Sequence, residues 1–143
     1  MLQQTSAPAN AYLRTQVQSS TPLERVVMLY DAAIRALDGA RTSMTKHDLL
    51  PRRAAISRLI GIVTELQNTL DLERGGQIAA DLDRLYDYVL TRILDAQTTQ
   101  KPQGLDEARR VLEPLRDAWQ AIAASTAPPA ATAPTATPGA STR

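Results

Sequence analysis

The sequence of 143 residues contains no cysteine, no phenylalanine and a single histidine. Without cysteine the chain can form no disulfide, no thiolate metal site and no cysteine nucleophile, which is typical of a protein in a reducing compartment. No apolar run approaches the roughly 20 residues of a membrane-spanning helix, and residues 1–10 lack the basic-then-apolar pattern of a signal peptide. We therefore expect a cytoplasmic (cytosolic) protein that does not insert into a membrane.

Excess charge is also absent, since 16 basic residues face 15 acidic residues and the net charge is +1. A nucleic-acid partner is not expected, because such binding needs clustered basic charge. The only histidine, His47, stands beside Asp48 in a predicted loop, and this pair lacks a third metal ligand. No glycine-rich phosphate loop follows a strand, and no Glu-x-x-His pair occurs. We predict no metal, no cofactor and no catalytic residue.

The residues that are present favour helices, because leucine and alanine are frequent and runs of β-branched residues are few. Thr21-Pro22-Leu23-Glu24 has the pattern of a capping box with proline at the first helical position, and it predicts a helix that ends near residues 46–48. A second helix is predicted to begin near residues 48–51, with Gly75 as its left-handed C-terminal cap and Gly76 adding freedom for the chain reversal. A third covers residues 77–99. A fourth follows a turn at residues 101–104 and contains Pro114, which is expected to kink it.

Each predicted helix has a seam of inward residues at steps of three and four, and short connections link the helices. We predict an all-α fold, an antiparallel four-helix bundle, over residues 21–124. Residues 1–20 are expected to be a flexible cap segment, and the Ala/Pro/Thr-rich residues 125–143 a disordered tail. The predicted inward residues include Leu37, Ile56, Leu59, Val63, Leu66, Ile78, Leu82, Leu85, Tyr86, Val89, Ile93, Leu105, Leu112, Leu115, Trp119 and Ile122.

The first predicted helix carries a second apolar stripe beside its seam, formed by Val26, Leu29, Ala33, Ala36 and Ala40. One interpretation is a wide, shallow groove that accepts a helix from a partner. The other is that the small residues pack against a neighbouring helix of the bundle. The sequence leaves both open.

Tyr88 raises a similar question, because it falls on the charged side of the third predicted helix, near Asp81 and Arg84. It is either part of an interface or an isolated exposed aromatic residue. The remaining carboxylates on this helix are interleaved with arginine, which is typical of a solvated face.

The tripeptide Leu-Tyr-Asp occurs at residues 29–31 and again at residues 85–87. Together with its surroundings it resembles the FliS family of flagellar secretion chaperones, over about residues 12–122. Two positions depart from the family pattern: Ala32 stands where glycine is common, and Pro114 stands where proline is unusual. The segments that carry the resemblance are Val17–Pro22, Val27–Ile34, Leu66–Asp71, Gly75-Gly76, Leu82–Tyr88 and Leu115–Trp119.

The resemblance implies a four-helix export chaperone of the bacterial cytoplasm that binds the largely disordered C-terminal segment of flagellin. It would prevent premature polymerisation and deliver flagellin to the flagellar type III export gate. In such proteins the N-terminal segment can cover part of the apolar surface. The flagellin-binding residues implied here are Tyr12 and Val17 as a displaceable cap, Val26, Leu29 and Ala33 as the groove floor, Tyr30 and Tyr86 packed in the bundle with hydroxyls near polar groups, and Tyr88.

Two other readings remain open. The chain could be a self-associating structural bundle that forms a homodimer, or a chaperone of another flagellar client. An enzyme is disfavoured, since no nucleophile or ligand set is found. On helical spacing alone, Asp31 is expected to pair with Arg35, and Asp87 with an arginine.

Overall fold

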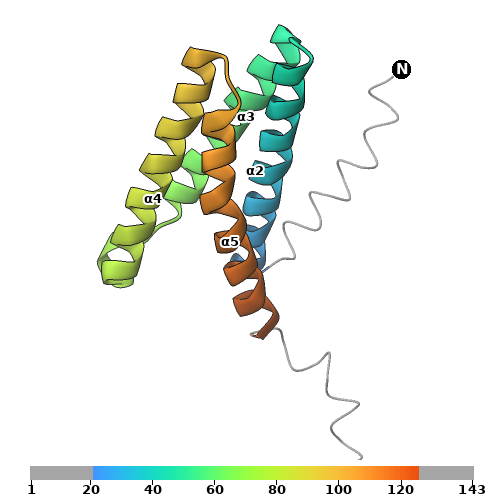
Figure 1. Cartoon of the computed structure of the whole chain (residues 1–143). Helices are drawn as coiled ribbons and strands as arrows, with labels where there is room; N and C mark the ends of the chain where they lie inside the picture. Colours follow the sequence, from blue (N-terminus) through green and yellow to red (C-terminus); the bar gives the residue numbers. More distant parts are fainter. Residues whose placement is uncertain (1–20, 126–143) are drawn as a thin grey trace, which may run out of the picture.

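The computed structural model describes residues 21–125, and these form an antiparallel four-helix bundle (Figure 1). Its helices are α2 (Pro22–Thr45), α3 (Leu49–Asn68), α4 (Leu72–Thr99) and α5 (Gln103–Ser125). The predicted all-α fold is therefore confirmed. The predicted cap segment before residue 21 and the predicted tail after residue 125 lie outside the described residues.

The first helix starts where the sequence predicts. The side chain of Thr21 accepts a hydrogen bond from the backbone N–H of Glu24 at 3.1 Å, and the Glu24 carboxylate accepts one from the N–H of Thr21 at 2.9 Å. Pro22 occupies the first turn, where its missing N–H costs nothing. Such a cap is worth about 1 kcal/mol, and it fixes the direction in which the chain enters the bundle.

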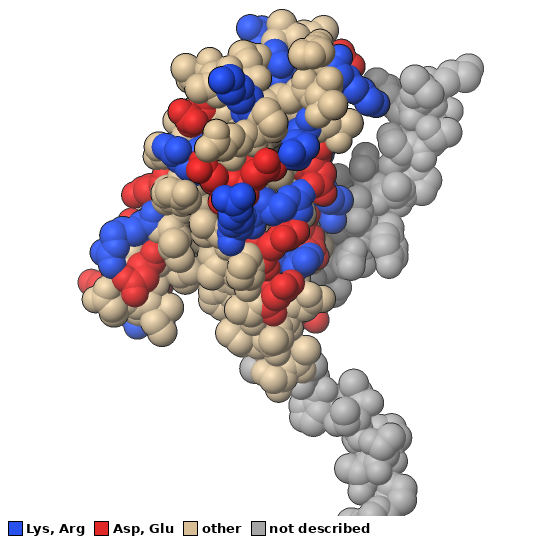
Figure 2. Space-filling view, viewed as in Figure 1, with Lys and Arg blue, Asp and Glu red and all other residues tan. Residues whose placement is uncertain are grey.

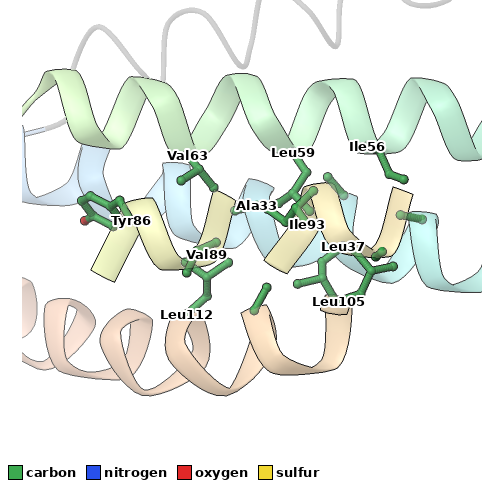
Figure 3. Packing of buried hydrophobic residues seen from close by; sticks show 14 of the residues in the cluster. Ala33, Leu37, Ile56, Leu59, Val63, Tyr86, Val89, Ile93, Leu105 and Leu112 are labelled. Atoms are coloured by element: carbon green, nitrogen blue, oxygen red, sulfur yellow. The ribbon is translucent and has the colours of Figure 1, made fainter. Parts of the chain in front are cut away.

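The core is a single, mostly aliphatic cluster with Tyr86 at one end (Figure 3), and Tyr30 belongs to the same cluster. Ala33 and Ala40 are fully buried within it and Ala36 is nearly so. At Gly39 a Cβ would lie 3.8 Å from the Cβ of Ala55, an ordinary van der Waals contact between α2 and α3. Ala33 and Ala40 therefore pack inside the bundle, and at these two alanines the alternative interpretation as an open groove is wrong. Ala36 lines a hollow on the surface between α2 and α3.

Helices α4 and α5 meet most closely at Gly104, in the first turn of α5. A Cβ at this position would overlap the backbone carbonyl oxygen of Arg92 and would lie 3.1 Å from the Cβ of Ala96. Gly104 was predicted only as a turn residue. The structure shows that it allows two helix backbones to pack together. Helix α5 then continues through Pro114 as one helix to Ser125.

The connection between α3 and α4 differs from the prediction. Helix α3 ends at Asn68, and the backbone N–H of Thr69 closes its last turn on Glu65 at 3.1 Å. Asp71 then caps a new helix by accepting from the N–H of Arg74 at 3.0 Å. The double glycine therefore does not end α3. It interrupts α4, where Gly76 has φ 55° and ψ −133°, a conformation that is almost restricted to glycine.

Three residues predicted to face inward are exposed, namely Ile78 (72%), Leu85 (37%) and Ile122 (44%). They lie in the early half of α4 and the late half of α5, and the two ribbons diverge toward these ends in Figure 1. The buried stripe of α4 runs through Ala79, Leu82 and Tyr86, so Ile78 and Leu85 flank it, and Ile122 lies beyond the last buried residue of α5, Leu112. The divergence of α4 and α5 opens the candidate site between them.

Candidate functional site

An apolar groove lies at the end of the bundle where α2 begins, α3 passes into α4, and α5 nears its end. Its volume is about 480 Å³. We call it the end groove. Its apolar walls are Leu23, Val26, Leu29, Leu70, Ile78, Ala79, Leu82, Tyr86 and Trp119, and Arg25, Glu65, Thr69 and Asp71 are its polar lining residues.

Every helix contributes to the end groove, so the bundle fold itself positions the site. Val26 and Leu29 are half-buried and pack against the core, and their outer edges line the groove. Ile78 is 72% exposed and lies two residues after the kink at Gly76. An exposed aliphatic residue beside an apolar hollow is typical of a surface that binds another molecule.

Two tyrosines meet behind the groove. The hydroxyls of Tyr30 and Tyr86 are hydrogen-bonded at 2.5 Å, and their rings lie 6.4 Å apart between centroids. The hydroxyls were expected to reach polar groups near the edge of the bundle, and each finds the other. Burial, with the bond from Tyr30 to Tyr86, raises the pKa of Tyr30, and burial also raises the pKa of Tyr86. Tyr86 lines the end groove, and Tyr30 lies behind it.

This pair predicts a loss of stability at alkaline pH. In the unfolded chain both tyrosines lose their protons near the ordinary pKa of 10.0, and in the fold only at higher pH. The stabilisation is therefore complete below about pH 10 and is lost as the pH rises through the folded-state pKa values. We expect the urea midpoint of unfolding to fall between about pH 8 and about pH 11. The double variant Tyr30→Phe/Tyr86→Phe should show a smaller fall, and an equal fall would contradict the assignment.

The structure brings together only some of the predicted site residues. Val26, Leu29 and Tyr86 line the end groove, and Tyr30 contacts it through Tyr86. Ala33 is fully buried in the core, so its predicted place on the groove floor is wrong.

Tyr88 is not among the groove residues. It is 44% exposed, and the guanidinium of Arg92 lies 5.7 Å from the centre of its ring. The remaining predicted residues, Tyr12 and Val17, lie outside the described residues.

The sequence interpretation missed the groove role of other residues. Trp119, Ile78 and Leu82 were predicted as ordinary core residues, yet each of them lines the end groove. A usable signal exists for Trp119. It is the only tryptophan in the chain and comes late in the last helix, where a large side chain can span the gap between diverging helices.

The polar contacts near the groove also differ from expectation. Asp31 accepts from Arg116 on α5 at 2.8 Å, so the predicted pairing with Arg35 is wrong. Asp87 accepts from the amide of Gln67 at 2.7 Å, where an arginine was expected. The bond between Asp31 and Arg116 joins α2 to α5. On the face seen in Figure 2, acidic and basic side chains are interleaved, whereas the lower end of α5 is largely uncharged. These contacts position α5, and with it Trp119.

A second ion pair also joins α2 to α5, because the guanidinium of Arg41 on α2 lies 2.7 Å from the carboxylate of Asp106 on α5. The hydrogen bond from Arg41 lowers the pKa of Asp106.

Among residues 21–125, no group of three potential metal ligands comes together. None of the helices in that range is long and apolar enough to cross a membrane.

A four-helix bundle whose helices together line an apolar groove has an architecture suited to binding an apolar segment of another molecule. Comparison with known proteins agrees: the family model described as flagellar protein FliS matches residues 5–126. The flagellar secretion chaperone FliS of Salmonella typhimurium is 34% identical over 81% of this chain and 87% of its own. FliSB of Pseudomonas aeruginosa is 32% identical over 77% and 87%, and FliS of Bacillus subtilis 26% identical over 79% and 84%. The chain belongs to the FliS family of flagellar secretion chaperones.

Proposed function

We propose that this protein is an export chaperone that binds the disordered C-terminal segment of flagellin in the bacterial cytoplasm. By holding that segment it prevents premature polymerisation, and it delivers flagellin to the flagellar type III export apparatus. The observation that carries the proposal is the end groove, a hollow with mostly apolar walls that the described residues 21–125 leave unfilled. The family membership supports a flagellar client.

The size of the groove suggests how a disordered client would bind. A volume of about 480 Å³ suits a few side chains and not a whole helix. The groove is therefore an anchor point, where apolar residues of flagellin insert, and the rest of the segment lies along the bundle surface. Burial of apolar area in such coupled folding and binding gives a negative heat-capacity change, offset in affinity by the cost of ordering the client.

A cap formed by Tyr12 and Val17 is consistent with the position of the groove. Pro22 and Leu23 line the groove, so the chain that precedes them joins the bundle at this point. Residues 1–20 are long enough to return over an opening that starts at residue 22, since an extended chain spans roughly 3.3–3.6 Å per residue. We propose that this segment and flagellin compete for the same apolar walls.

The test is calorimetric titration of the full chain with a peptide of the host flagellin's C-terminal region. The proposal predicts saturable one-to-one binding with a negative heat-capacity change. No binding by a bundle that circular dichroism shows to be folded would rule out this client.

In that case sedimentation velocity without any client, at rising protein concentration, would distinguish the two remaining candidates. Exposed Ile78, Leu85 and Ile122 would suit a homodimer interface. A concentration-dependent size would favour the homodimer, and a constant monomer would favour a different flagellar client.

A further inference from the structure

The two buried tyrosines have one more hydrogen-bond donor than they use between themselves. Each hydroxyl carries a single proton, and the bond between Tyr30 and Tyr86 uses one of the two. The indole of Trp119 also interacts with the Tyr30 hydroxyl, but an indole N–H only donates and cannot accept the remaining proton. The hydrogen bonds found for the pair within residues 21–125 therefore leave one O–H donor unused.

The position of the two rings indicates which hydroxyl keeps this donor. Tyr30 is fully buried and is not a lining residue of the end groove. Tyr86 lines the groove although only 2% of its surface is exposed, and Figure 3 shows it at the end of the core cluster with its hydroxyl directed away from Val89. The arrangement fits a series of hydrogen bonds in which Trp119 donates to Tyr30 and Tyr30 donates to Tyr86. The hydroxyl proton of Tyr86 is then available to an acceptor in the groove.

We propose that Tyr86 donates a hydrogen bond to an uncharged acceptor of the bound client, and so selects segments that present such an acceptor between apolar residues. The inference rests on the proposed chaperone function and adds a chemical requirement on the client. A buried donor without a partner costs binding free energy, so a client that is apolar throughout is bound less tightly than one that satisfies Tyr86.

The acceptor class follows from the surroundings. Carbonyl groups inside a helix are already bonded, so the acceptor is a backbone carbonyl at an irregular position or the side-chain oxygen of Asn, Gln, Ser or Thr. A carboxylate is disfavoured for two reasons. It would lose its hydration in an apolar groove, and the charged lining residues are two carboxylates, Glu65 and Asp71, against one cation, Arg25.

The test compares Tyr86→Phe with Tyr30→Phe, using calorimetric titration with the flagellin C-terminal peptide. We expect Tyr86→Phe to weaken binding about tenfold, because the acceptor of the client is then buried without a donor. In Tyr30→Phe the hydroxyl of Tyr86 keeps its proton, so the loss should stay below about threefold. Circular dichroism and a urea titration on both variants show that each is folded.

Two results would overturn the inference. One is binding by Tyr86→Phe within about twofold of the wild type. The other is an equal loss in both variants, which would mean that the pair acts only through the packing of the bundle. If the wild type itself fails to bind the peptide, the proposed function fails and the inference about its client fails with it. If the wild type binds the peptide and Tyr86→Phe binds it equally well, only the proposed hydrogen bond from Tyr86 is ruled out, and the proposed chaperone function is not affected.

Discussion

Replacing Ile78 with aspartate is expected to weaken binding of the flagellin peptide roughly 10- to 100-fold while the bundle stays folded. Ile78 lines the end groove, yet it is 72% exposed in the free protein. Its change therefore removes little packing from the fold. On binding, the isoleucine would bury apolar surface worth about 1.5–3 kcal/mol, and an aspartate would instead have to lose its hydration. Calorimetric titration measures the loss.

The matched control is Leu94→Asp on the same helix. Leu94 is 50% exposed and is not among the residues of the end groove. The Leu94→Asp variant introduces the same charge and removes a side chain of the same size, so it should leave the peptide affinity within about twofold of the wild type. Equal losses in both variants would mean that the client binds elsewhere, or that charge alone decides the affinity.

Gly104→Ala is expected to destabilise the protein by roughly 2–4 kcal/mol. The added methyl group would overlap the backbone carbonyl oxygen of Arg92 and crowd Ala96. A backbone carbonyl cannot rotate away as a side chain could, so α5 must move away from α4. For a domain of this size the melting temperature should fall by roughly 10–20 °C, and differential scanning calorimetry measures the fall.

Gly61→Ala is the control, because it makes the same chemical change within a helix. Nothing lies within 4 Å of a Cβ built at Gly61, and the residue lies inside α3. Alanine favours a helix over glycine by about 0.5–1 kcal/mol, so this variant should be slightly more stable than the wild type. If Gly104→Ala melted at the wild-type temperature, the close packing of α4 and α5 would be refuted.

The sequence predicts the fold well where local rules decide. The capping box at Thr21 and Glu24 is formed by residues three apart, so its geometry can be derived before any tertiary contact is known. The inward positions of Leu59, Val89 and Leu112 follow from helical period alone, and all three are fully buried.

The sequence predicts the fold less well where distance along the chain separates the partners. Spacing predicts that Asp31 pairs with Arg35, but Arg116, 85 positions away, binds it in the folded bundle. The left-handed cap was predicted at Gly75, but it is Gly76 that has a positive φ, and Asp71 caps the next helix before either glycine is reached. A local pattern cannot show which of two competing boundary signals prevails.

The candidate site could be predicted only in part for the same reason. Val26 and Leu29 were placed on a groove from one helix, and both line the end groove. The opposite wall, with Ile78 and Trp119, exists because α4 and α5 diverge at this end of the bundle. Helical period shows which face of a helix is apolar, but it does not show whether a second helix covers that face.

Fluorescence of Trp119 during titration with a tryptophan-free flagellin C-terminal peptide tests most directly whether the end groove binds the client. Trp119 is the only tryptophan in the chain and lines the groove, so its emission reports on this site alone. Occupation of the groove should exclude water from the indole and shift its emission to shorter wavelength, saturating at one peptide per protein. Saturable binding by calorimetry with unchanged Trp119 emission would show that the client binds away from the end groove.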